Sequence, residues 1–237
     1  MIVYGRNAVR EALRGRRASA VGPIWATGSA LGEEWMPAER TRLAGEAELE
    51  RLCSSPDHQG VCADAGDYPY ADGSSLLAGD DALVVCLDRV QDPRNLGAVC
   101  RVAECAGAAG LVIPSRRSAA VTAAVCKASA GAVEHLSVAR VGNLTDFLVR
   151  AKGAGAWVYG AAAEATVAYD EPDYSGRVVL VLGSEGAGIG SRVASACDQL
   201  VGLPVRGRIG SLNVSAAAAA LLYGILQRRE PRVDRAP

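Results

Sequence analysis

The sequence predicts an α/β protein whose larger part is organised around a mostly parallel sheet. Short, chiefly apolar runs at residues 83–87 and 177–182 have the composition of strands buried on both faces. Segments with helical periodicity, such as 95–106 and 144–152, alternate with these runs. Further strands are expected at 111–113, 136–141, 157–159 and 200–203, and a further helix at 119–130. This alternation is typical of parallel strands joined by helical crossovers.

A smaller α/β module precedes this part. Residues 6–13 and 46–53 have the pattern of helices, and residues 24–26 and 59–63 that of strands. Residues 65–81 are rich in Gly, Asp, Ser, Tyr and Pro and show neither period, so a domain boundary is expected there. We expect a small domain at 1–70, a linker at 71–81, a larger domain at 82–230 and a frayed tail at 231–237.

The composition argues against several classes of protein. Half of the 237 residues are hydrophobic, which allows a sizeable core and argues against global disorder. The net charge of −1 argues against a protein that coats nucleic acid non-specifically, although a local basic face can still recognise RNA. There are seven cysteines, none in a Cys-x-x-Cys pair, and only two histidines. We therefore expect neither a metal site nor a disulfide framework.

The sequence also lacks the patterns of membrane and secretory segments. Scattered arginines interrupt the first 13 residues, which is unlike a secretory signal. The longest apolar stretch, 214–222, is too short to cross a bilayer. We expect a soluble, cytoplasmic protein with no membrane partner.

Three arginines near the amino terminus form a possible basic stripe. Arg6, Arg10 and Arg14 are spaced i, i+4, i+8 and would share one face of the first helix. Two interpretations have similar weight: an ordinary solvated face, or a row of contacts to RNA phosphates.

The first stretch that could carry chemistry is 88–101, which follows a predicted buried strand. Open α/β sheets place ligands at this end of their strands. Asp92 and Pro93 have the pattern of an N-cap followed by proline at the first helical position. Arg94 and Arg101 are seven residues apart and share a helix face. They are either surface charges, with Asn95 satisfying the helix end, or groups aimed at a phosphate or ribose.

A second stretch, the glycine-rich segment 183–190, follows the strand expected at 177–182. Glycines let backbone N–H groups approach a ligand closely, but a tight turn would need them too. The segment matches neither a P-loop, nor a dinucleotide fingerprint, nor a Gly-x-Ser-x-Gly elbow. Glu185 is the more informative residue, because its carboxylate would lie beside a bound ligand.

The third stretch, 211–215, opens an alanine-rich helix that is apolar on all sides and is therefore expected to be buried. Ser211, Asn213 and Ser215 lie where a helix presents free backbone N–H groups. Ser211 is either simply the N-cap or part of a ligand site. Arg206 and Arg208, in the preceding loop, are either solvated charges or further RNA contacts.

Together these stretches resemble the SpoU/TrmH family of RNA ribose 2′-O-methyltransferases, within the SPOUT superfamily. Its motif Asn-x-Gly-x-x-x-Arg is matched by Asn95, Gly97 and Arg101. An apolar strand running into Gly-x-Glu-Gly is matched at 179–186, and Ser-Leu-Asn-Val-Ser at 211–215. The resemblance covers residues 82–229. Residues 2–9 and 59–61 also resemble the small RNA-binding domain, similar to ribosomal protein L30e, of the RlmB-type branch.

This resemblance implies a fold, a cofactor and an assembly. The larger domain should be a trefoil-knotted methyltransferase domain with a parallel sheet. S-adenosylmethionine should be the methyl donor, held by backbone groups near Gly183, Leu203 and Leu212. The enzyme should be a homodimer with its active site at or near the dimer interface, and should need no metal.

The resemblance also implies roles for the motif residues. Arg101 should be essential, either as the proposed general base or, because arginine stays protonated, as a phosphate anchor. Asn95 and Asn213 should fix Arg101 and its loop, Glu185 should orient polar groups or the donor, and Ser211 should contact substrate or a catalytic side chain. RNA contacts are expected from Arg6, Arg10, Arg14 and Arg94.

The substrate is expected to be a guanosine of 23S ribosomal RNA, since the first domain resembles the RlmB-type branch. A transfer-RNA guanosine methyltransferase and a ribosomal-RNA methyltransferase conferring antibiotic resistance are the nearest alternatives. A non-catalytic RNA-binding module is a candidate from another class. A dinucleotide-dependent dehydrogenase would need a fingerprint early in the chain, which the sequence lacks.

Overall fold

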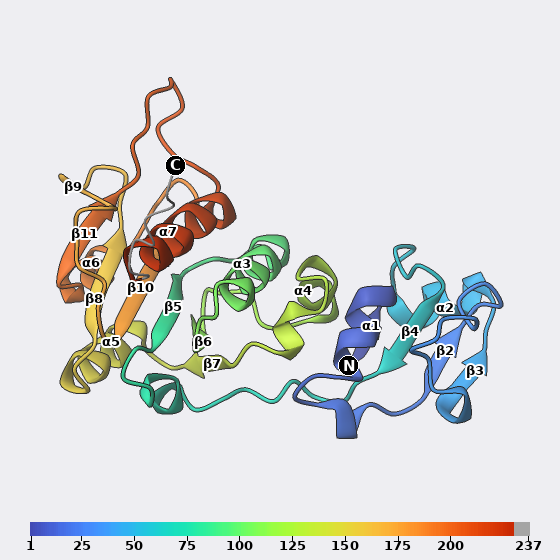
Figure 1. Ribbon diagram of the computed structural model, residues 1–237. Coiled ribbons are helices and arrows are strands. Elements are labelled where there is room, and N and C mark those ends of the chain that lie inside the picture. Colours follow the sequence, from blue (N-terminus) through green and yellow to red (C-terminus); the bar gives the residue numbers. More distant parts are fainter. Residues whose placement is uncertain (230–237) are drawn as a thin grey trace, which may run out of the picture. The chain divides into compact units, whose positions relative to one another are not determined.

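The computed structural model describes residues 1–229 and divides the chain into two compact units (Figure 1). The first unit comprises Met1–Pro69 and Val121–His135, and the second comprises Tyr70–Ala120 and the chain from Leu136 onward. The tail expected at 231–237 lies outside the described residues. Within residues 1–229, none of the helices combines the length and apolar character that crossing a bilayer requires.

The second unit is a seven-stranded sheet in which every strand pair is parallel. Its strand order is β7-β6-β5-β10-β8-β11-β9. The strands are β5 (Leu83–Asp88), β6 (Gly110–Pro114), β7 (Val138–Val141), β8 (Trp157–Ala161), β9 (Val167–Ala168), β10 (Val178–Gly183) and β11 (Gln199–Gly202). The apolar runs predicted as buried strands correspond to the centre of this sheet, where β5 and β10 pair.

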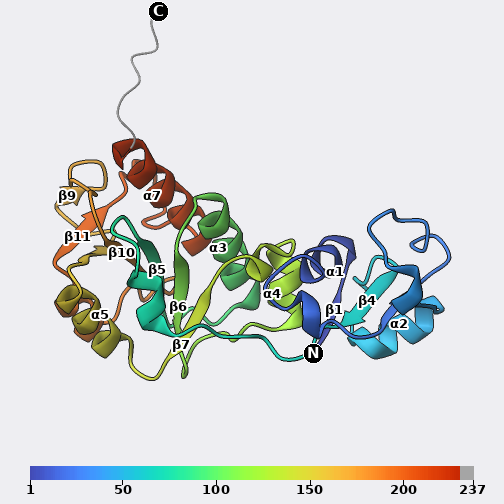
Figure 2. The same cartoon turned by 60° about the horizontal axis from the view of Figure 1, so that its bottom comes forward.

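Helices cover both faces of this sheet (Figure 2). On one face α3 packs against β6, α7 packs against β10, and the two helices contact each other. On the other face α5 and the short helix η3 join the core that contains Val84, Val112 and Val181. The helices are η3 (Gly73–Leu77), α3 (Pro93–Cys105), α5 (Leu144–Gly153), α6 (Ser191–Ala196) and α7 (Val214–Arg229). Burial on both faces explains why the central strands are continuously apolar rather than alternating.

Two features of the second unit differ from the sequence-based expectations. The segment expected as a linker at 71–81 contains η3, whose Leu76 and Leu77 are buried against the same core as Phe147 of α5. Helix α7 is not buried all round, because Ala216, Ala220 and Tyr223 form an exposed stripe along it. Alanine is small enough to occur on both buried and exposed helix surfaces. An alanine-rich pattern therefore does not show which face of the helix is exposed to solvent.

The first unit has a mixed four-stranded sheet in the order β1-β4-β2-β3, in which only β2 and β3 are parallel. Helix α2 covers one face with Leu49, which packs with Cys62 and Trp25, and α1 contacts β4 and contributes buried Val9. The elements are β1 (Ile2–Tyr4), α1 (Arg6–Ala12), η1 (Ala18–Ala20), β2 (Ile24–Ala26), η2 (Ala38–Arg40), β3 (Thr41–Leu43), α2 (Glu46–Cys53) and β4 (Val61–Asp64).

Residues 121–135 belong with this first unit although they lie within the range predicted for the larger domain. They contain α4 (Ala123–Ala128) and η4 (Ala132–Glu134), which contact β1 and α1. Gly131 allows the close approach: its backbone is left-handed (φ 87°), and a Cβ there would lie 2.6 Å from the Cβ of Glu11. The helical pattern at 119–130 predicted a helix, but periodicity cannot say which core the helix joins.

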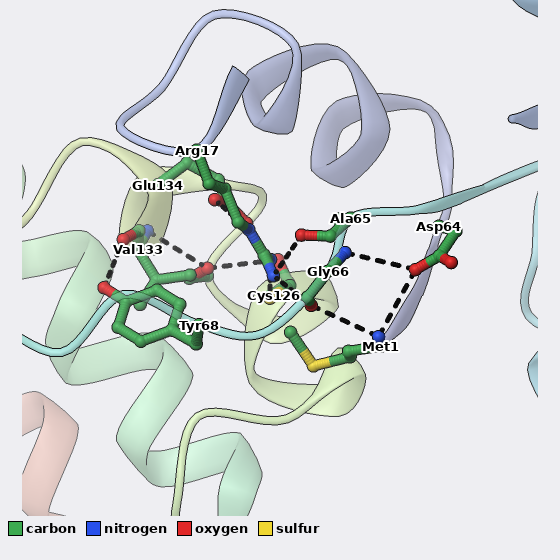
Figure 3. Close-up of polar contacts among 10 residues, drawn as sticks. Met1, Arg17, Asp64, Ala65, Gly66, Tyr68, Cys126, Val133 and Glu134 are labelled. Carbon is green, nitrogen blue, oxygen red and sulfur yellow. Dashed lines mark hydrogen bonds and ion pairs between the residues drawn. The ribbon is translucent and has the colours of Figure 1, made fainter. Parts of the chain in front are cut away.

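A buried ion pair fixes this segment (Figure 3). Arg17 donates to both carboxylate oxygens of Glu134, from Nε at 2.8 Å and from Nη2 at 2.6 Å, and the two side chains are only 2% and 1% exposed. Arg17 also donates to the carbonyl of Ala65 and to the thiol of Cys126. Burial disfavours the charged guanidinium, but the hydrogen bonds to Glu134 outweigh this and raise the pKa of Arg17.

We predict that Arg17→Met destabilises the first unit by about 3–5 kcal/mol, because Glu134 is left as a buried, unpaired carboxylate. Urea unfolding can be followed in a Trp157→Phe background, where Trp25 and Trp35 report on the first unit alone. The exposed neighbour Arg16→Met is the matched control and should change stability by less than about 0.5 kcal/mol. The double variant Arg17→Met/Glu134→Leu should recover much of the loss, and equal stabilities of Arg17→Met and its control would contradict the prediction.

Candidate functional site

The candidate site lies in the second unit, at the carboxyl edge of its parallel sheet. Gly183 at the end of β10 pairs with Asp88 at the end of β5, so the segments that follow these two strands leave the sheet side by side. Asp88 is 5% exposed, and its Oδ2 accepts a 2.7 Å hydrogen bond from the backbone N–H of Gly190. Arg89 contacts the same carboxylate at 3.3 Å and donates to the carbonyl of Gly188. The glycine-rich loop 183–190 is therefore tied to the end of β5.

One residue from each of the three predicted stretches meets the others at this edge. Asn95 donates from Nδ2 to Oε1 of Glu185 at 3.0 Å, and Asn213 donates from its own Nδ2 to the same oxygen. Asn213 also donates to Oδ1 of Asn95 at 3.0 Å. Three segments separated by up to 118 positions thus share one closed set of hydrogen bonds. Glu185 is the acceptor on which both amides converge.

Asn213 also caps the helix that follows it. Its Oδ1 accepts hydrogen bonds from the backbone N–H of Ser215 at 2.8 Å and from the Ser215 hydroxyl at 2.6 Å. Helix α7 therefore begins at Val214 with Asn213 as its cap, which excludes the first of the two interpretations of Ser211, that it is simply the N-cap. Ser211 lies three positions before the helix, where its side chain cannot reach the first free N–H groups.

A pocket of about 340 Å³ opens beside the glycine-rich loop. Gly183, Leu203 and Leu212, the residues expected to hold a cofactor, all line it. Ser211 and Glu185 line it as well, whereas Asn95, Arg101 and Asn213 do not. Further lining residues come from the glycine-rich loop, from the end of β8, from the segments that follow β8 and β11, and from α7, including Ile189, Ala161, Glu164, Val205 and Leu221. The wall thus combines apolar side chains with polar backbone groups and two carboxylates, Glu164 and Glu185.

Close backbone packing shapes this pocket. A Cβ on Gly183 would lie 2.0 Å from the carbonyl carbon of Gly188, so no side chain fits at the end of β10 without moving the loop. The loop folds back through a backbone hydrogen bond from Gly188 to Ser184 of 2.9 Å. The glycine at 183 is therefore required by close approach, in addition to any contact with a ligand.

Arg101 and Arg94 lie on α3 and are both exposed, as their seven-residue spacing predicts. The predicted cap of this helix is confirmed: Asp92 accepts from the backbone N–H of Arg94 at 2.8 Å and Pro93 follows it. Neither arginine side chain makes an ion pair with another described residue. Both guanidinium groups are therefore available to a ligand.

The predicted stripe in the first unit is less available. Arg6 pairs with Glu33 at 2.6 Å and Arg10 with Glu11 at 2.8 Å. Arg14 is exposed, but it follows the end of α1 at Ala12, so it does not extend a helical row. Intramolecular acids thus compete for two of the three positions expected to contact RNA.

Asp88 and Arg89 connect the motifs, and sequence reasoning gave neither of them a role. The available signal was an acidic residue directly after a continuous apolar strand, since buried carboxylates require partners. The sequence did not indicate that the partner would be the backbone of Gly190, 102 positions away.

Comparisons with known proteins agree with this arrangement. Residues 82–223 match the model of the SpoU rRNA Methylase family, and residues 2–71 match the model of the RNA 2′-O ribose methyltransferase substrate binding domain. The chain belongs to the SpoU methylase family. It is thus an RNA ribose 2′-O-methyltransferase of the TrmH type with an N-terminal substrate-binding domain.

Relatives that align with nearly the whole chain support this membership. YacO of Bacillus subtilis, named as a TrmH family tRNA/rRNA methyltransferase, is 37% identical over 242 residues, which is 97% of this chain and 96% of its own. A protein of Mycobacterium bovis BCG, named as a tRNA/rRNA methyltransferase, is 39% identical over 250 residues, 98% of this chain and 76% of its own.

Solved structures share the fold. An AdoMet-bound rRNA methyltransferase from Sinorhizobium meliloti matches with a TM-score of 0.81 and 25% identity, over 97% of this chain and 88% of that one. The SpoU methyltransferase AviRb from Streptomyces viridochromogenes, in complex with AdoMet, gives a TM-score of 0.80 at 24% identity, over 97% and 90%. A TrmH/SpoU tRNA modifying enzyme from A. aeolicus gives 0.58 at 24% identity and covers 66% of this chain and 80% of its own.

We predict that Gly183→Ala weakens binding of S-adenosylmethionine at least tenfold, because the added Cβ must displace the loop at Gly188. Isothermal titration calorimetry measures the affinity. Gly207→Ala is the matched control, since a Cβ there meets nothing within 4 Å, and should change affinity less than about twofold. Unchanged affinity of Gly183→Ala would show that the loop yields without cost.

Proposed function

We propose that this SpoU-family enzyme transfers the methyl group of S-adenosylmethionine to the ribose 2′-hydroxyl of a guanosine in 23S ribosomal RNA. The observation that carries the proposal is the closed hydrogen-bond set of Asn95, Glu185 and Asn213 beside the pocket at 183–190. These residues belong to the three stretches whose motifs resemble those of the family. The preceding substrate-binding domain supplies a second surface for the RNA.

The pocket fits S-adenosylmethionine. Its volume of about 340 Å³ lies in the range of small-molecule sites, and its wall includes apolar side chains such as Ile189, Leu203 and Leu212, which suit the adenine ring. The carboxylates of Glu164 and Glu185 lie on the wall, where they suit a ligand with ammonium and sulfonium charges. Backbone groups of the loop beginning at Gly183, together with Leu203 and Leu212, would hold the cofactor. When bound, it supplies an electrophilic methyl group.

Arg101 acts on the RNA. A ribose hydroxyl is a poor nucleophile and must lose its proton as it attacks, so a positive group beside it stabilises the developing alkoxide. Arginine side chains are permanent cations in proteins, and we therefore assign Arg101 this electrostatic role together with binding of the adjacent phosphate. Its exposure leaves it free to take both roles.

Asn95, Glu185 and Asn213 are positioning residues in this proposal. Their mutual hydrogen bonds fix the first turn of α3 against the start of α7, and Arg101 lies two turns along α3. Holding reactants in the attacking geometry can supply much of the rate enhancement of a transfer reaction. Ser211, on the pocket wall, contacts substrate.

A ribosomal substrate is supported by the extent of the structural match. The S. meliloti rRNA methyltransferase shares the fold over 97% of the chain, including the first unit, whereas the A. aeolicus tRNA modifying enzyme covers 66%. A transfer-RNA substrate and an antibiotic-resistance methylase are the competing enzyme functions. A non-catalytic RNA-binding module would not need a cofactor-sized pocket whose Glu185 is hydrogen-bonded to Asn95 and Asn213.

A homodimer is the proposed assembly, and the exposed stripe of α7 supports it. Tyr223 is 48% exposed and lies on the same stripe as the exposed Ala216 and Ala220, so the stripe offers apolar side chains to a second copy of the chain. A cytoplasmic location and a trefoil knot in the second unit complete the proposal.

Methyl transfer to protein-free ribosomal RNA and to transfer RNA, offered in parallel with labelled S-adenosylmethionine, tests the reaction. We predict 2′-O-methyl label on one 23S guanosine. Arg101→Ala should lower kcat at least 100-fold, by the magnitude typical of a lost transition-state donor. Arg101→Lys should also lose most activity, because lysine lacks the bidentate fork. Label on transfer RNA alone would overturn the substrate, and near-normal turnover by Arg101→Ala would overturn the role of Arg101.

We predict that Tyr223→Glu shifts the protein from dimer to monomer, because a charge on the α7 stripe opposes its burial against a second copy. Light scattering coupled to size-exclusion chromatography measures the mass. Val149→Glu places the same charge on an exposed apolar position of α5 and should leave the dimer intact. A monomeric wild-type chain would refute the assembly.

A further inference from the structure

A second arginine-bearing loop lies at the same edge of the sheet, and the methyl-transfer motifs do not include it. Strand β6 pairs in parallel with β5 and ends at Pro114, and the loop 115–119 follows it. In the sheet, β5 lies between β6 and β10. The loop 115–119 after β6 and the glycine-rich loop after β10 therefore leave the sheet on either side of the end of β5. The loop carries two adjacent arginines, Arg116 and Arg117.

The backbone of this loop is unusual. Arg117 has a left-handed conformation, with φ of 57°, and so does Arg89 after β5, with φ of 59°. Among the described residues of the second unit, these two arginines are the only non-glycine residues with positive φ. Glycine would adopt this conformation without steric cost, so arginine at 117 retains a long cationic side chain at the expense of backbone strain. Strain of this kind is concentrated at functional sites.

Hydrogen bonds hold the loop rigidly. The backbone N–H of Ser115 donates to the Val141 carbonyl at 2.7 Å, and Arg140 donates from Nη2 to the Ser115 carbonyl at 3.0 Å. At the other end, the Ser118 hydroxyl and the Ala119 N–H both donate to the carbonyl of Val90, at 3.2 and 2.8 Å. The loop is thus fixed both to β7 and to the segment that leads from β5 into α3.

The two arginine side chains are exposed, and their charge is not neutralised. Neither Arg116 nor Arg117 forms an ion pair or a side-chain hydrogen bond with any residue in the described part of the chain. By contrast, Arg89 and Arg140 make contacts within the protein, with Asp88 and with the ring of Tyr70 respectively. A rigid loop that presents two unpaired guanidinium groups is preorganised for anions, and guanidinium matches phosphate with two parallel hydrogen bonds.

We propose that Arg116 and Arg117 bind the sugar–phosphate backbone of the RNA substrate beside the nucleotide that is methylated. This site rests on the proposed function, since it takes the same RNA, but it contributes binding rather than chemistry. The contact to Val90 couples the loop to the segment that begins the first motif. Binding of RNA phosphates by this loop would therefore help to position the ribose of the methylated nucleotide at Arg101.

Binding of protein-free 23S ribosomal RNA, measured by filter binding over a range of salt concentrations, tests the site. Arg116→Ala/Arg117→Ala should raise the Kd and the KM for RNA at least tenfold, with kcat and the affinity for S-adenosylmethionine unchanged. The slope of log Kd against log salt concentration should fall by about 1.4, since each lost single-strand phosphate contact contributes about 0.7. Arg150→Ala is the matched control. It removes an exposed arginine from α5, which covers the face of the sheet opposite to α3 and α7.

Arg117→Gly separates a binding role from a structural one. Glycine relieves the left-handed strain, so this variant should melt at an equal or higher temperature than the wild type and still bind RNA more weakly. The proposed site would be overturned if Arg116→Ala/Arg117→Ala showed the same RNA affinity and the same salt slope as the control Arg150→Ala. Wild-type protein that binds RNA but transfers no methyl group would overturn the proposed function alone, whereas wild-type protein that binds no RNA would overturn both.

Discussion

Strands β5 and β10 each contribute six residues to one parallel pairing, so Asp88 and Gly183 leave the sheet as neighbours. Both strands are buried on both faces, which fixes their register through the packing of every side chain. The chain between them, from Arg89 to Arg177, is 89 residues long, yet the pairing brings the first motif and the glycine-rich loop to one place. The pocket and the hydrogen bonds of Glu185 follow from this arrangement.

The polar groups at this edge are satisfied by one another across long sequence distances. Asp88 accepts from the backbone of Gly190, Glu185 accepts from two asparagines, and Asn213 caps α7 with its remaining oxygen. The arginines at the same edge are divided between two roles. Arg89 holds the loop through Asp88, whereas Arg101, Arg116 and Arg117 stay exposed. The acids at this edge are hydrogen-bonded within the protein, whereas these three guanidinium groups are exposed and make no ion pair with a described residue, which suits a polyanionic substrate.

Local sequence patterns were sufficient to predict most of the strands and helices of the second unit. The continuous apolar runs predicted β5, β6 and β10, and the Asp92–Pro93 pair predicted where α3 begins, because these signals depend on neighbouring residues only. Short elements were missed, among them β1, β3, β9 and α6. These elements are two to six residues long, and such short segments carry too little periodicity to be distinguished from loop.

The sequence by itself determined the fold class, the family and the motif residues, since the family's motifs are short and local. The tertiary structure decided which residues contact one another. It placed residues 121–135 with the first unit through the Arg17–Glu134 pair, moved the helix cap from Ser211 to Asn213, and left one stripe of α7 exposed. Each depends on which surface packs against which, and periodicity within one segment contains no information about the partner of its buried face.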